Sequence, residues 1–356
     1  MENHKLRMSI STLVVIMLLL ACNLPSQSPT EPTATATPAK VMDTVAPPPA
    51  ATEAIPHVLI PVSLPENRSS HAGDYDSSVT AQQKKSNGGD RFTFERFERP
   101  FNANTMDVYF PELDIVDTFV YQDDTWIYGT IQVVDRSAAK SSPYRFAMQL
   151  DVEVDGKGDW LVVASNPAST DWTTNGVQVF FDTNSDVGDL TAMFTDPDSK
   201  SDGFETKVFD QGKVEDADAA WVRVSPKDPN TVEIAVKRSL VGNPPMYLID
   251  MWTGHATLDP TMFDYSDHFT HEQAGAADPE LPIFYPIKAV YELDNSCRMA
   301  VGFQPTGKEP GLCQVIVSIK VGPGTPAPTA CQRDPACSGC GAIWDSATCT
   351  CSYVPC

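Results

Sequence analysis

The chain has 356 residues, of which 47 are acidic and 25 are basic, giving a formal net charge of −22 at pH 7. A surface of that sign repels phosphate backbones and anionic lipid headgroups, so nucleic acid is not an expected partner. Acidity also keeps an exported protein soluble, and this explanation suffices for most of the carboxylates.

The N-terminus is typical of an exported protein. Two basic residues, Lys5 and Arg7, precede an apolar run over residues 13–20. A charged start, a short apolar run and small residues before a cleavage point define a secretory signal peptide. The run is shorter than the roughly 20 apolar residues that a permanent membrane helix needs. The pattern therefore predicts a signal peptide over residues 1–21 that is removed.

The four residues that end this run, Leu19-Leu20-Ala21-Cys22, resemble the lipobox of bacterial lipoproteins. In that family the cysteine thiol is diacylated and becomes the new N-terminus. The resemblance implies a lipid anchor on Cys22 and a place in the cell envelope, with the chain facing outside the cytoplasm. Two or three acyl chains give the stable attachment that a single chain does not. The alternative is an ordinary secretory signal that happens to end beside a cysteine.

Residues 22–90 are predicted to hold the anchor and a disordered linker rich in Pro, Thr and Ser. Eight prolines lie between residues 23 and 56, and Thr and Ala fill the gaps between them. Such a composition cannot bury a core, and its prolines favour extended polyproline geometry. The linker is expected to lift the folded part away from the lipid surface.

Residues 91–321 are predicted to form an all-β sandwich. Apolar and polar residues alternate with period two in many short runs, turn sequences such as Asp-Gly and Asn-Pro separate the runs, and no helical period is sustained. Short half-buried strands must cover one another's apolar faces, which a sandwich achieves most simply. The expected strands are residues 126–133, 146–154, 159–164, 177–182, 221–224, 232–236, 247–252 and 315–321.

The order of several motifs within residues 114–252 resembles that of DOMON-like β-sandwiches, which include the family-nine carbohydrate-binding modules. The motifs are Asp114-Ile115, Trp126-Ile127-Tyr128-Gly129-Thr130-Ile131, Gly176-Val177-Gln178-Val179-Phe180-Phe181-Asp182, Val232-Glu233-Ile234-Ala235-Val236 and Ser239-Leu240-Val241-Gly242. Members of these families bind sugars or haem. The resemblance implies a jelly-roll-like sandwich that binds a ligand, and no His or Met spacing supports haem. A glycan or surface polymer is therefore the favoured ligand.

One acidic loop has the spacing of a calcium site. Residues 151–159, Asp-Val-Glu-Val-Asp-Gly-Lys-Gly-Asp, place carboxylates at relative positions one, three, five and nine, with glycine at position six for the turn. The loop resembles the calcium-binding hairpins of integrin-type repeats, although a Glu stands where Asp or Asn is usual. The predicted Ca²⁺ ligands are the side chains of Asp151, Glu153, Asp155 and Asp159 and the backbone carbonyl of Lys157.

Two other interpretations of acidic segments stay open beside the calcium site. A strand with an acidic solvent face explains Asp151 and Glu153, but it does not explain the Asp-Gly-x-Gly-Asp turn. A second acidic loop, residues 182–189, has Val187 at the glycine position and is predicted as an Asx-rich turn.

Catalytic motifs are missing from the sequence. It contains no Gly-x-Ser-x-Gly, no Walker loop and no His-Glu-x-x-His. A glycosidase needs only two well-placed carboxylates, and sequence cannot place such a pair in space. Trp172 lies in the polar run at residues 169–175 and is the tryptophan expected on an exposed loop, where its ring would stack on a sugar.

Eight cysteines remain if Cys22 is acylated, and an even number in an oxidising compartment favours disulfides. Cys297 and Cys313 are predicted to pair, because turn sequences between them bring the chain back. Residues 322–330 form a second Pro-rich linker, and residues 331–356 form a small module that needs disulfides to stay folded. The pairing within the module stays open among Cys331, Cys337, Cys340, Cys349, Cys351 and Cys356.

Three functional hypotheses follow from the sequence. The leading one is a lipid-anchored protein whose sandwich binds a carbohydrate, with calcium as a stabilising ion. The second is an exported enzyme that acts on extracellular polymers, and the third is an envelope structural or adhesion protein without a small ligand. A cleft beside two carboxylates would favour the enzyme, and a flat aromatic face would favour the binding protein.

Overall fold

The computed structural model describes residues 55–86, 90–92, 95–138, 143–188, 202–276 and 286–313, together with the backbone of residues 342–345 and 350–353. The predicted signal peptide, Cys22, and the strand expected at residues 315–321 lie outside this set. So do the side chains of the six tail cysteines, and the predictions that concern these residues stay predictions.

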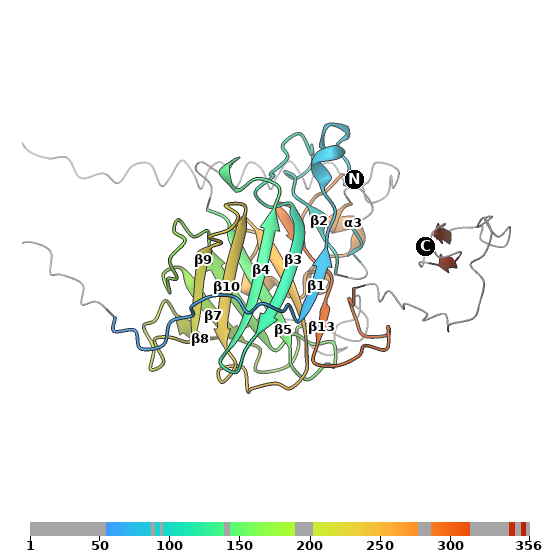
Figure 1. Ribbon diagram of the computed structural model, residues 1–356. Coiled ribbons are helices and arrows are strands. Elements are labelled where there is room, and N and C mark those ends of the chain that lie inside the picture. The colour runs from blue at the N-terminus through green and yellow to red at the C-terminus, as the bar shows by residue number, and fades with distance from the viewer. Residues whose placement is uncertain are drawn as a thin grey trace, which may run out of the picture. The chain divides into compact units, whose positions relative to one another are not determined.

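The smaller of two antiparallel sheets has five strands in the order β1-β3-β4-β10-β9 (Figure 1). Along β4 the side chains alternate: Ile127 and Ile131 point into the sandwich, whereas Trp126 and Tyr128 lie on the outer face. The alternation in the sequence therefore separates the two faces of this sheet. Its strands are β1 (Ser70–Gly73), β3 (Ile115–Gln122), β4 (Trp126–Val133), β9 (Ala220–Val224) and β10 (Thr231–Lys237).

The larger sheet is also antiparallel and has the order β2-β12-β11-β5-β6-β7-β8, with β13 as a further strand on β11. Strands β12 and β13 pair with opposite ends of β11 along the same edge, so they act as one interrupted strand. The strands are β2 (Glu98–Arg99), β5 (Arg145–Asp151), β6 (Trp160–Ser165), β7 (Val177–Phe181), β8 (Thr206–Asp210), β11 (Tyr247–Gly254), β12 (Leu293–Asn295) and β13 (Met299–Val301).

The main core lies between the two sheets, and it confirms the all-β sandwich. Apolar side chains of β4 and β10 meet those of β5, β6 and β11 across it. Gly129 lies in the middle of β4, where the core leaves no room for a side chain. A Cβ there would lie 2.3 Å from the Met148 sulfur and 2.7 Å from the Met251 methyl group. The absence of a side chain at residue 129 lets these two methionines fill the centre of the core.

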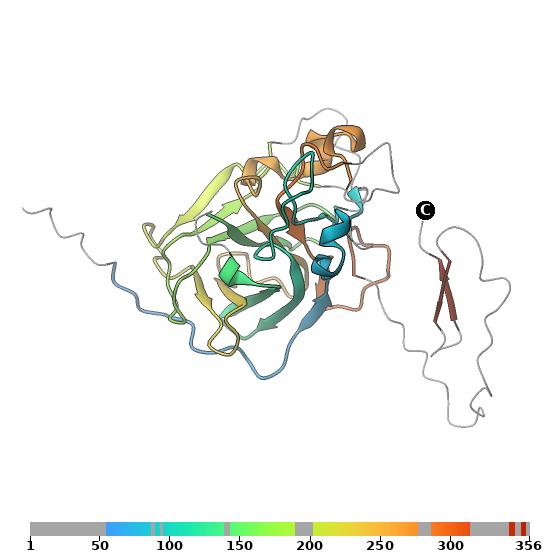
Figure 2. The ribbon, with the colours of Figure 1, turned by 90° about the horizontal axis from the view of Figure 1, so that it is seen from above.

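The larger sheet is covered on its second face as well. Ala147, Leu161 and Trp252 on that face pack with Phe97 and Phe263 from the connecting segments in a second apolar cluster. Short helices belong to this layer, and Figure 2 shows the orange helices on the side of the sandwich opposite the blue N-terminal segment. They are α2 (Tyr265–His268) and α3 (His271–Ala274), and 3₁₀ turns lie at Ser77–Val79, Ala81–Gln83, Arg136–Ala138 and Pro260–Met262.

This covering layer corrects one interpretation of the sequence. The strand predicted over residues 146–154 was considered as one with an acidic solvent face, but Gln149 and Asp151 are each only 2% exposed. The strand itself ends at Asp151, because the carboxylate of that residue accepts the backbone N–H groups of the following turn. The acidic-strand alternative therefore does not describe Asp151.

The sandwich begins before the boundary predicted at residue 91. Strand β1 pairs with β3, and an N-terminal strap, residues 55–64, runs along the outer face of the smaller sheet (Figures 1 and 2). Leu64 of the strap packs against the Trp126, Tyr128 and Trp221 cluster on this face. The folded part thus includes a segment whose Pro-rich composition predicts a linker.

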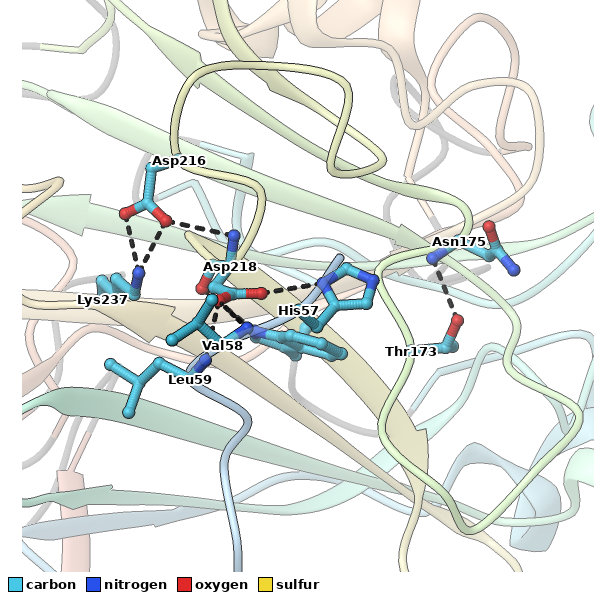
Figure 3. Close-up of polar contacts among 9 residues, drawn as sticks. His57, Val58, Leu59, Thr173, Asn175, Asp216, Asp218 and Lys237 are labelled. Atoms are coloured by element: carbon cyan, nitrogen blue, oxygen red, sulfur yellow. Dashed lines mark hydrogen bonds and ion pairs between the residues drawn. The ribbon is translucent and has the colours of Figure 1, made fainter. Parts of the chain in front are cut away.

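The carboxylate of Asp218 clamps this strap (Figure 3). One oxygen lies 2.7 Å from His57 Nδ1, and the other accepts the backbone N–H groups of Val58 at 2.8 Å and Leu59 at 2.7 Å. The His57 ring packs on Trp221, with 4.6 Å between the centroids. One buried carboxylate therefore binds three consecutive residues of the strap.

Within the predicted C-terminal module, β14 (Ala342–Asp345) and β15 (Thr350–Tyr353) form an antiparallel hairpin. No helix in the described part of the chain has the length and apolar character needed to cross a membrane.

Candidate ligand pocket and acidic cluster

A pocket of about 460 Å³ opens at the edge where the two sheets approach each other. Strand β1 of the smaller sheet lies beside β13 of the larger one at this edge (Figure 1). The volume falls in the range of about 300–1,000 Å³ that is typical of small-molecule sites. The pocket is lined by His71, Ala72, Gly73, Asp74, Tyr75, Arg96, Glu98, Asn295, Cys297 and Cys313.

Polar side chains and one exposed ring give the pocket its chemistry. Tyr75 is 48% exposed and offers an aromatic face. The His71 ring stacks on Phe119, with 4.7 Å between the centroids, and its Nε2 lies 2.5 Å from Asp117. Arg96 donates one guanidinium N–H to the carbonyl of Leu312, whereas its Nε has no hydrogen-bond partner among the described residues. The pocket thus offers both donors and acceptors.

The disulfide between Cys297 and Cys313 forms part of the wall, and it confirms the pairing predicted from the sequence. Cys313 N–H donates to the carbonyl of Arg298, and Arg298 N–H donates to that of Gly311, so the chain on both sides of the bond is held by backbone contacts. The bond ties the segment after β13 to the connection between β12 and β13.

Three buried carboxylates meet directly behind this pocket. Glu98 comes from β2, Asp114 immediately precedes β3, and Asp294 lies on β12, so both sheets contribute to the group. One oxygen from each lies within 4.8 Å of the others. Glu98 is 2% exposed, and Asp114 and Asp294 are 0% exposed. We call these three residues the acidic cluster.

Each carboxylate of the acidic cluster has one oxygen held by a protein donor. The Ser77 hydroxyl donates to Glu98 Oε1 at 2.6 Å, the Tyr109 hydroxyl donates to Asp114 Oδ2, and the Ile115 N–H donates to Asp294 Oδ2 at 2.6 Å. The second oxygen of each is buried and has no hydrogen-bond partner in the described part of the chain. Three orphaned oxygens in one place are unusual, because buried polar atoms are nearly always paired.

Burial and mutual repulsion raise the pKa of every carboxyl group here. Desolvation, followed by the charges of neighbouring carboxylates, holds the pKa of Glu98 and of Asp294 well above the ordinary range. Burial also raises the pKa of Asp114 to about 8. Asp74 lines the pocket beside the cluster, and desolvation raises its pKa to about 7, against the effects of the Tyr75 N–H and Arg96. The cluster therefore gains from any positive charge placed among its oxygens.

The predicted calcium loop is a turn at the end of β5 in which carboxylates accept backbone N–H groups. Asp151 accepts the N–H groups of Val154 and Gly156, and Asp159 accepts that of Val152. Desolvation raises the pKa of Asp159 to about 6, partly offset by the Val152 N–H. The structure does not gather Asp151, Glu153, Asp155 and Asp159 into a group of three ligand atoms comparable to the acidic cluster. The calcium site there stays a prediction.

The second acidic loop has the turn geometry expected from the sequence. Asp182 accepts the N–H groups of Asn184, Ser185 and Val187, which makes it an Asx-rich turn. The two acidic loops lie side by side, because Gly158 N–H donates to the carbonyl of Val187.

Trp172 lies on the outer face of the smaller sheet, away from the residues of the pocket. It is half-buried: the Arg223 guanidinium lies 4.3 Å from its ring centroid, and its indole N–H donates to the strap carbonyl of Val62 at 3.4 Å. Sugar stacking at Trp172 stays a prediction, but one face of the ring already has a partner.

Sequence reasoning missed most of the pocket and the cluster. Asp114 was noted only as part of a motif before a strand, and Glu98, Asp294 and Asp74 were not noted at all. The available signal was a single acidic residue next to apolar neighbours, as in Phe97-Glu98 and Leu293-Asp294. That signal is shared by many surface strands, so only the fold reveals that these side chains meet.

Comparison with known proteins gives no further guide: no protein-family model, curated protein or solved structure matches this chain. The function must therefore be argued from the geometry of the pocket and of the cluster behind it.

Proposed function

We propose that the chain is a lipid-anchored protein of the cell envelope whose β-sandwich is a carbohydrate-binding domain, and that the pocket beside the disulfide is its ligand site. The observation that carries this proposal is the polar pocket of about 460 Å³ at the edge of the sandwich. Sugars present many hydroxyl groups together with apolar ring faces. The pocket offers Asp74 and His71 for hydrogen bonds and the exposed Tyr75 ring for stacking.

The arrangement of carboxylates favours a binding protein over a hydrolase. Two carboxyl groups line the pocket, Asp74 and Glu98, but Glu98 is only 2% exposed. Hydrolysis of a glycosidic bond uses two carboxyl groups that both reach the substrate. Asp74 is the less buried of the two, so the pocket offers a bound sugar at most one carboxyl group, whereas bond cleavage requires two.

Retention of the purified protein on an array of plant and bacterial polysaccharides tests the proposal. We expect retention by the wild type and a loss of roughly two- to tenfold in affinity for Tyr75→Ala, because stacking on one aromatic ring is worth about 0.5–1.5 kcal/mol. Met246→Ala, at an exposed residue outside the pocket, is the control and should bind as the wild type does.

Three outcomes would contradict this assignment. Absence of retention on every polysaccharide would remove the carbohydrate ligand. Loss of retention in Trp172→Ala, together with full retention in Tyr75→Ala, would move the binding site to the outer face of the smaller sheet. Release of reducing ends from a bound polymer, abolished by Asp74→Asn, would make the protein an enzyme.

A further inference from the structure

The orphaned oxygens of the acidic cluster need a positive partner that the described residues do not supply. The strongest charges acting on Glu98, Asp114 and Asp294 all come from carboxylates, namely from one another and from Asp74, Asp76 and Asp90. An ionised carboxylate that is buried without a partner is among the costliest groups in a fold. Either protons or a cation must offset this charge.

The hydrogen bonds to the partnered oxygen of each carboxylate favour a cation over protons. Ser77, Tyr109 and the Ile115 N–H each donate to one oxygen of the cluster, and donors of this kind stabilise the ionised form of a carboxylate. They also fix the orientation of each carboxylate, as the groups around metal ligands commonly do. The second oxygens have no donor in the described part of the chain. One oxygen from each carboxylate lies within 4.8 Å of the others, as the ligands of a single ion must.

We infer that Glu98, Asp114 and Asp294 bind one hard divalent cation, with calcium as the matching ion, between the two sheets and behind the pocket. Calcium takes carboxylate oxygens and tolerates irregular geometry, whereas magnesium demands a near-ideal octahedron. Three carboxylates and one divalent cation leave a single negative charge, far less than the empty group carries. Glu98 also lines the pocket, which gives the ion a path from solvent.

This site is distinct from the calcium loop predicted at residues 151–159, and it does not require that the ligand of the pocket be a carbohydrate. Because β2, β12 and the start of β3 supply the ligands, the ion would join the two sheets at their open edge. Removal of the ion should therefore lower the free energy of unfolding of the whole sandwich.

Calcium titration of chelator-treated full-length protein, read by calorimetry and by equilibrium dialysis, tests the inference. We expect Asp294→Asn and Glu98→Gln to bind one ion fewer than the wild type. Asp124→Asn, an exposed acidic residue, should bind as the wild type does. Asp151→Asn separates the two candidate sites, because it should leave the ion at the acidic cluster in place.

Thermal unfolding supplies a second measurement that does not depend on counting ions. At free calcium about 100 times Kd, the midpoint of the wild type should rise by a few degrees. In chelator, Asp294→Asn should melt above the wild type, because it removes one of the mutually repelling carboxylates, and calcium should add little to it.

Equal ion counts and affinities in the wild type, Asp294→Asn and Glu98→Gln would overturn the inference. Loss of the ion in Asp151→Asn alone would also overturn it, by placing calcium only in the loop. If both cluster variants fail to fold, a crystal of the wild type grown in calcium decides, and absence of a calcium peak among the three carboxylates would refute the site.

Discussion

Asp218 shows how one side chain can decide where a segment without secondary structure goes. Burial pushes the pKa of Asp218 upward, but the N–H groups of Leu59 and Val58 and the ring of His57 outweigh burial and hold the pKa below its usual value. A carboxylate that gains donors on folding favours the folded state. The strap thus depends on an electrostatic clamp, with apolar packing near Leu64 as its other contact.

Asp218→Ala is predicted to release the strap. Charge-assisted hydrogen bonds of this kind are worth about 1.5–3 kcal/mol, so we expect a loss of about 2 kcal/mol in the free energy of unfolding. Hydrogen exchange should show the amides of Val58 and Leu59 losing protection. The control is Asp107→Asn: Asp107 pairs with Lys84 at the surface, and such pairs contribute less than about 1 kcal/mol. Unchanged protection in Asp218→Ala would show that the clamp is not needed.

The clamp also has a defined pH dependence. Because the folded pKa of Asp218 lies below the unfolded value of about 3.9, its contribution is complete above that pH and is lost as the pH falls through the folded pKa. Strap protection in the wild type should therefore persist at pH 5 and fall only in acid stronger than the unfolded pKa of about 3.9. Loss of protection between about pH 7 and 5 would contradict this prediction.

At the scale of elements, the strands predicted most accurately are those whose own residues show a clear apolar pattern. The strands β4, β7, β10 and β11 were predicted within two residues of their observed ends. The strands β1, β2, β12 and β13 were not predicted, because they are two to four residues long and are defined by the strand they pair with. The longer strands β3 and β8 were not among the expected strands either. These same short strands build the pocket and hold two of the three residues of the acidic cluster. The site was therefore hidden where sequence patterns are weakest.

The disulfide at Cys297 and Cys313 is predicted to stabilise this weak edge. The bond closes a loop with a sequence separation of 16 and should contribute about 3 kcal/mol in the chain-entropy model. The double variant Cys297→Ala/Cys313→Ala should lose about that amount in denaturant unfolding, and it should weaken sugar binding, because both residues line the pocket. Reduction of the wild type should reproduce both effects. Unchanged stability in the double variant would show that the backbone contacts of Arg298 hold the edge alone.

At the scale of the whole molecule, the all-β class followed from period-two alternation, but the third layer did not. The residues that cover the larger sheet, such as Phe97, Leu258 and Phe263, are scattered through turn-rich segments without a period. One signal was present in the sequence: the run Leu161-Val162-Val163-Ala164 is apolar at every position, as expected for a strand buried on both faces. A sandwich with exposed outer faces therefore describes neither sheet fully, because the strap also covers part of the outer face of the smaller one.

Charge and anchor together give a last prediction, for the complete chain. Removal of Glu2, Lys5 and Arg7 with the signal peptide leaves 46 acidic and 23 basic residues, a net charge of −23. A protein of that charge is repelled by anionic headgroups, so the proposed acyl chains on Cys22 would supply the whole of its membrane affinity. Wild-type protein should partition into the detergent phase, and Cys22→Ala should remain entirely in water. High salt should not release the wild type, since screening weakens charge repulsion and leaves the lipid contact unchanged. Wild-type protein recovered wholly from the aqueous phase would rule out the anchor and leave residues 1–21 as an ordinary secretory signal.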